Sequence, residues 1–168
     1  MKTFLSLLFT ACVLANAGCG GSLSVQQDWD PGYSFADIDA YAWLPIRSSP
    51  NIGEPRLKRL VAAIDAEMAA KQMALTAEEP DVLLELHVMS EKRLGLDQYG
   101  STASWNKDDS GDLDKGSVMV DVLDAKTRAV VWRVVADGKV DPSATPEEQT
   151  KKFAKLAKKL FEKFPPPE

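Results

Sequence analysis

The sequence predicts an α+β fold in a single domain, with a mostly antiparallel sheet of about four to five strands and two helices packed on one face. Apolar and polar residues alternate over 81–90, 118–122 and 130–138, which is typical of half-buried strands. Apolar residues recur at helical spacing over 54–72 and 145–164. A chain of 168 residues with 45% hydrophobic content has the size and composition of one compact core.

The N-terminal part of the domain is expected to form two short strands. The first covers 23–29 with Val25 facing inward, and it ends at a turn over 30–32, where proline and glycine favour reversal of the chain. The second covers 41–44 and is stopped by Pro45. The apolar residues around it are expected to belong to the core and not to a ligand platform: Tyr33, Phe35, Ile38, Tyr41, Trp43 and Leu44.

The first helix is predicted over 54–72. Pro55 suits a first helical turn, and five alanines favour the helix and allow close packing on a sheet. The apolar positions at helical spacing are Leu57, Leu60, Val61, Ile64 and Met68. This helix is therefore expected to cover the sheet.

The second half of the domain is predicted to contain a hairpin followed by the closing helix. The strands over 118–122 and 130–138 are joined by a turn over 124–128. Thr145 and Glu148 form a capping-box pattern at the start of the helix. Its apolar stripe is Phe153, Leu156, Leu160 and Phe164, and its lysines at 151, 152, 155, 158, 159 and 163 are expected to form a solvated face, although contact with anionic headgroups is an alternative.

The first 18 residues have the pattern of a bacterial lipoprotein signal peptide. An apolar run over 4–14 is followed by small residues and then by Cys19, the one cysteine left after removal of that segment. We expect Cys19 to carry the acyl chains, such as palmitate, that attach the protein to a membrane, with 19–24 as a tether and 25–168 as the domain. Asn16 departs from the usual pattern, in which an apolar residue precedes the cysteine by three positions.

The same segment also fits ordinary signal-peptide cleavage after Ala17, which would release a soluble periplasmic protein beginning at Gly18. Under the lipoprotein interpretation, no aspartate follows Cys19, which favours the periplasmic leaflet of the outer membrane. The formal net charge of −5 disfavours nucleic acid as a partner, because phosphates require a basic surface.

No catalytic motif is present in the sequence. His87 is the single histidine, and its position on the polar side of a strand gives it neither a cysteine nor a second histidine with which to share a metal. The zincin, P-loop, nucleophile-elbow and dinucleotide-binding patterns are absent. We therefore expect no enzymatic activity and no cofactor.

The segment over 92–116 is the stretch in which a site could be hidden, because it is long and rich in Gly, Ser and Asp. Its alternating oxygen ligands resemble a calcium loop, but Ser117 stands where a bidentate glutamate is needed, so a solvated acidic loop is the alternative. Tyr99 and Trp105 are candidate contact residues. The candidate metal ligands are Asn106, Asp108, Ser110, Asp112 and Asp114.

Several segments in order along the chain resemble a known family. They are 28–31 with Tyr33 and Phe35, then 41–45, 80–84, 120–124, 131–138 and the final 164–166. On these residues the chain resembles the bacterial lipoproteins called domain of unknown function 4136. The resemblance implies an exported, usually lipidated α+β domain whose activity is not established, and it transfers no site residue.

The sequence thus predicts a lipid-anchored, non-enzymatic protein of the cell envelope that binds or scaffolds an unidentified envelope protein or polymer. The alternative is a soluble periplasmic domain that binds calcium or a small ligand through the loop over 106–114. A hydrolase whose carboxylates converge only in the folded chain is a third hypothesis.

Overall fold

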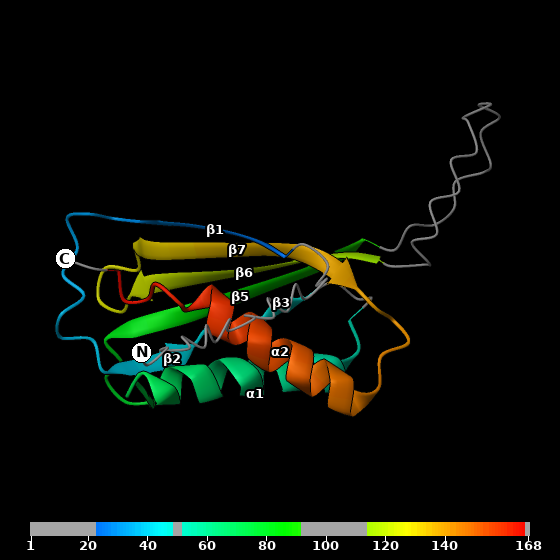
Figure 1. Cartoon of the computed structure of the whole chain (residues 1–168). Helices are drawn as coiled ribbons and strands as arrows, with labels where there is room; N and C mark the ends of the chain where they lie inside the picture. Colours follow the sequence, from blue (N-terminus) through cyan, green and yellow to red (C-terminus); the bar gives the residue numbers. More distant parts are fainter. Residues whose placement is uncertain (1–22, 49–51, 92–113, 167–168) are drawn as a thin grey trace, which may run out of the picture.

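The structure is a computed structural model that describes residues 23–48, 52–91 and 114–166 (Figure 1). The elements in chain order are β1 (Ser24–Trp29), β2 (Ala40–Trp43), β3 (Arg47–Ser48), α1 (Glu54–Ala70), β4 (Ala74–Leu75), β5 (Val82–Glu91), β6 (Asp114–Asp124), β7 (Val130–Val140) and α2 (Pro146–Leu160).

The strands form one mixed sheet in the order β1-β7-β6-β5-β2-β4, with the short β3 beside β5. The pairs β1/β7, β7/β6 and β6/β5 are antiparallel, whereas β2/β5, β2/β4 and β3/β5 are parallel. The expectation of a mostly antiparallel sheet of four to five strands was therefore wrong. The direction differs because a helix that crosses over between two neighbouring strands makes them parallel, as α1 does for β2 and β5. The number of strands differs because β3 and β4 are too short to show alternation in the sequence.

The predicted hairpin is confirmed as β6 and β7, which pair antiparallel. Both strands are longer than expected, because β6 begins at Asp114 and β7 continues to Val140. β5 pairs with β6 along its whole length, from Val82 opposite Asp124 to Glu91 opposite Lys115. These three long strands form the centre of the sheet.

The two helices are those predicted, and each ends a little earlier. α1 ends at Ala70, and Gln72 has a left-handed backbone with φ of 65°. The capping box of α2 is confirmed: the Thr145 hydroxyl accepts the Glu148 backbone N–H at 3.2 Å, and the Glu148 carboxylate accepts that of Thr145 at 2.9 Å. Neither helix in the described part of the chain is long and apolar enough to cross a membrane.

Both helices pack on one face of the sheet, and the core lies between them and the strands (Figure 1). Along the middle of the central strands the helix-facing residues are buried, from Val82 to Val88, Val118 to Val122 and Trp132 to Ala136, as the alternation in the sequence predicts. Trp132 of β7 stacks on Phe161 with ring centroids 5.5 Å apart and meets Phe164 edge-on at 4.9 Å. The residues that follow α2 therefore belong to the core although the helix has ended.

A polar contact fixes α1 to β2. Tyr41 Oη and Trp43 Nε1 both donate hydrogen bonds of 2.8 Å to the same carboxylate oxygen of Asp65. Burial, and then the bond to Asp65, raise the pKa of the Tyr41 phenol far above its usual range. Tyr41 is 1% exposed, which confirms its predicted place in the core.

The aromatic cluster gives a prediction about stability. Phe161→Ala should lower the free energy of unfolding by about 3 to 5 kcal/mol, because it leaves a cavity against Trp132. Urea denaturation followed by tryptophan fluorescence measures this loss. Val130→Ala is the control, since Val130 is 44% exposed and its truncation should cost less than about 0.5 kcal/mol. Similar losses for both variants would contradict the place of Phe161 in the buried aromatic cluster.

Candidate binding groove

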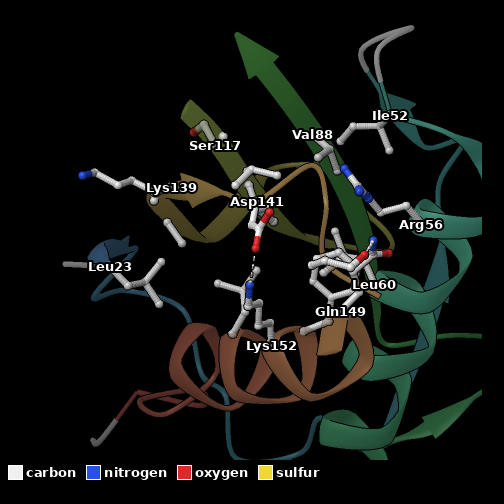
Figure 2. A pocket seen from close by; sticks show the side chains of 18 of the residues that line it. Leu23, Ile52, Arg56, Leu60, Val88, Ser117, Lys139, Asp141, Gln149 and Lys152 are labelled. Carbon is white, nitrogen blue, oxygen red and sulfur yellow. Dashed lines mark hydrogen bonds and ion pairs between the residues drawn. The ribbon is translucent and has the colours of Figure 1, made fainter. Parts of the chain in front are cut away.

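A groove of about 580 Å³ opens between the sheet and both helices (Figure 2). It lies where β5 and β7 end and β6 begins, and α1 and α2 supply its other walls. Its volume falls within the usual range for pockets that hold small ligands, roughly 300 to 1,000 Å³. We take it as the candidate functional site because its volume suits a small ligand and its lining combines apolar and cationic side chains.

The groove exists because the side chains on the helix face of β6 and β7 become smaller toward this end. Val120 is paired with Val134, and two residues further along Val118 is paired with Ala136. The next pair on that face consists of two glycines, Gly116 and Gly138. Side chains that would otherwise fill the space under the helices are therefore missing, and glycines inside strands often mark such a place.

The walls of the groove are apolar. Leu57 and Leu60 line it from α1, Phe153 and Leu156 line it from α2, and Leu23 lies at its edge just before β1. Phe153 and Leu156 are partly buried and belong to the apolar stripe predicted for the closing helix. The end of this stripe nearest the groove therefore faces a part of the sheet whose side chains leave the space unfilled.

The mouth of the groove is basic although the whole chain is acidic. Among the residues that the structure describes, five cationic side chains and one acidic side chain line the groove, in a protein whose formal net charge is −5. Lys152 Nζ lies 3.5 Å from the Asp141 carboxylate, and hydrogen bonds from Ser143 hold the pKa of that carboxyl below its usual range. The five cationic residues are Arg56, Lys139, Lys152, Lys155 and Lys159.

Gln149 is the buried polar residue of the lining, and its amide has partners at both ends. Its nitrogen donates to the Ala144 carbonyl at 2.7 Å, and its oxygen accepts from Arg59 Nη2 at 2.7 Å. The amide of Gln149 is thus hydrogen-bonded to other residues of the protein. The interior of the groove therefore offers a ligand mainly apolar surface (Figure 2).

A second polar cluster lies on the opposite face of the sheet, which neither helix covers. Glu85, Asp121 and Arg133 stand opposite one another on β5, β6 and β7. Arg133 donates two hydrogen bonds to Asp121, at 2.6 and 2.7 Å, and these raise the pKa of the guanidinium. His87 Nε2 lies 3.5 Å from Glu85 Oε1. From the sequence, only cysteine and histidine were considered as metal-sharing partners of His87, and Asp121 lies on another strand, 34 residues further along the chain.

One of the site residues predicted from the sequence lies within the described part of the chain. Asp114 is the first residue of β6 and its backbone pairs with Val140, but its side chain is not described. The remaining predicted residues lie outside the described part of the chain, so the lipidation, calcium and contact hypotheses stay predictions. They are Cys19, Tyr99, Trp105, Asn106, Asp108, Ser110 and Asp112.

The model of a protein family, described as domain of unknown function (DUF4136), matches residues 25–166. The chain belongs to this family. No curated protein matched the DUF4136 chain.

Solved structures share the fold of this DUF4136 protein at low sequence identity. A PDZ domain protein from Parabacteroides distasonis matches with a TM-score of 0.58 and 14% identity over 88% of this chain, which spans 37% of that protein. A PelC dodecamer from Paraburkholderia phytofirmans matches with a TM-score of 0.50 and 16% identity, over 83% of this chain and 95% of the other. At these identities the likeness concerns the fold alone.

The glycine pair at the floor of the groove gives a second prediction. Gly116→Ala should destabilise the protein by about 1 to 3 kcal/mol, because the new Cβ would collide with Val140 Cγ2, on a side chain that is stiff at χ1. Gly138→Ala is the matched control: its Cβ would meet the end of the flexible Leu23 side chain at 3.1 Å, and its stability should be unchanged or slightly higher. Thermal unfolding of both variants measures the difference, and equal stabilities would contradict the described packing.

Proposed function

We propose that this protein is an exported, lipid-anchored protein of the cell envelope that binds an anionic amphiphile without catalysing a reaction. The ligand we propose is a single acyl chain with a carboxylate or phosphate headgroup. The observation that supports this most strongly is the combination, in one groove, of apolar walls and a basic mouth.

The two parts of the groove suit the two parts of such a ligand. Apolar walls stabilise an acyl chain by about 0.8 kcal/mol for each buried methylene group, without needing any specific polar contact. The lysines at the mouth are exposed, so they keep their hydration until a negative headgroup approaches. Three of the five lysines of α2 line the groove, at positions 152, 155 and 159.

The position of the groove is consistent with attachment to a membrane through Cys19. Leu23, which lines the groove, follows Cys19 by four residues, and four residues of extended chain span at most about 14 Å. A lipid on Cys19 would thus hold the groove close to the membrane surface from which an amphiphile could enter. The family assignment supports this location at a membrane, because the chain resembles relatives that are usually lipidated.

The anchor is tested by the mass of the N-terminal peptide in membrane fractions. The native protein should begin at Cys19 and carry the added mass of acyl chains, and Cys19→Ser should move to the soluble fraction because the attachment site is lost. A native peptide that begins at Gly18 with no added mass would contradict lipid attachment. Amphiphile binding in the groove would then have to be considered for a soluble periplasmic protein.

Ligand binding is tested with a fluorescent fatty acid and by its displacement. Palmitate and lysophosphatidylglycerol should displace the probe, and zwitterionic lysophosphatidylcholine should do so less well because its headgroup carries no net negative charge. The Lys152→Glu/Lys155→Glu protein should bind the probe at least tenfold more weakly, since it reverses charges at the mouth. Gly138→Leu should also weaken binding, because its side chain would occupy the groove.

The matched control is Lys151→Glu/Lys158→Glu, which makes the same change of charge on the same helix at two exposed positions outside the groove lining. Its affinity should remain close to that of the native protein. Equal losses for the two double variants would show that only overall charge matters, and the absence of saturable binding by the native protein would overturn the proposal.

A further inference from the structure

The open face of the sheet brings three potential metal ligands together. Glu85 and His87 are two residues apart on β5, so their side chains lie on the same face, and Asp121 of β6 stands directly opposite Glu85. One ligand atom from each lies within 4.8 Å of the other two. From this arrangement we infer that Glu85, His87 and Asp121 form a binding site for a divalent transition-metal ion.

The spacing of the three side chains is close to what a small metal ion requires. Ligand atoms at about 2.0 to 2.2 Å from one zinc ion stand about 3.3 Å from each other. His87 Nε2 and Glu85 Oε1 are already 3.5 Å apart, and the remaining separations are at most 4.8 Å. Small rotations of the partly exposed Glu85 and His87 side chains would bring the ligand atoms from at most 4.8 Å to about 3.3 Å apart, with no movement of the strands.

Arg133 orients the third ligand and leaves room for the metal. Asp121 is 3% exposed and accepts both hydrogen bonds of the Arg133 guanidinium, which fixes its carboxylate plane. A carboxylate has about four acceptor positions, so two remain on the side of β5. Carboxylate ligands are commonly held in this way by a second hydrogen-bonded residue. The guanidinium charge opposes a cation, and we therefore expect only moderate affinity.

The donor set determines the class of metal. One imidazole nitrogen with two carboxylate oxygens suits zinc and neighbouring first-row divalent ions, whereas calcium and magnesium prefer oxygen ligands alone. Neither α1 nor α2 covers this face of the sheet, so among the described elements nothing helical keeps water from completing the coordination. The site lies on the face opposite the groove, and the inference does not depend on amphiphile binding.

The test uses the Cys19→Ser protein, which has no thiol outside the signal segment to bind zinc. Calorimetry with zinc chloride should show one site per chain with micromolar affinity, and Glu85→Gln and His87→Gln should each weaken binding at least tenfold. Because His87 is the single histidine of the chain, its imidazole nuclear magnetic resonance signals are unambiguous. Saturating zinc should shift these signals, and calcium chloride should leave them in place.

The matched control is Asp28→Asn. Asp28 stands on the other side of Arg133 in the same row, so this variant removes a nearby carboxylate that is not a proposed ligand, and zinc affinity should be unchanged. Circular dichroism confirms that each variant is folded. Unshifted His87 signals at saturating zinc would overturn the inference. Equal zinc affinities in the Cys19→Ser protein and in its Glu85→Gln and His87→Gln variants would also overturn it, since zinc would then be bound elsewhere.

Discussion

The packing of both helices on one face of the sheet is the constraint on which the other features depend. It requires a continuous apolar surface on that face, and the central strands supply it with valine and leucine at every second position. It also leaves the other face without a helical cover, so the residues there combine polar groups with apolar side chains. The groove, the core and the Glu85–His87–Asp121 cluster are three consequences of this one arrangement.

The core and the groove differ only in the size of the facing side chains. Where β6 and β7 present Val120 and Val134, these side chains fill the space under the helices. A void at that place would remove van der Waals contacts and so destabilise the fold. Where they present Gly116 and Gly138, the strands project no side chain toward the helices at that pair of positions, and the groove opens there. The two glycines thus convert one end of a core into a groove without any change in the direction of the strands.

Alternation and helical spacing were sufficient to predict the three long strands, both helices and the face they cover. The parallel pairing of β2 with β5 was not predicted, because it depends on the crossover of α1 and leaves no mark in the residues of β2 and β5. The groove was missed since Gly116 was assigned to the preceding loop and not to a strand. The cluster around His87 was missed for a related reason, because a register between strands places Asp121 beside it.

The contrast between the charge of the whole chain and that of the groove mouth illustrates why composition alone is a poor guide to the ligand. At physiological ionic strength, charges more than about 8 Å apart are largely screened from one another. A ligand at the mouth therefore responds to the lysines of α2 and not to acidic residues on distant surfaces. The Glu85–His87–Asp121 cluster lies on the opposite face of the sheet from the groove, so the two sites meet solvent on different sides of it. An acidic protein can in this way offer one surface suited to anions and another suited to cations.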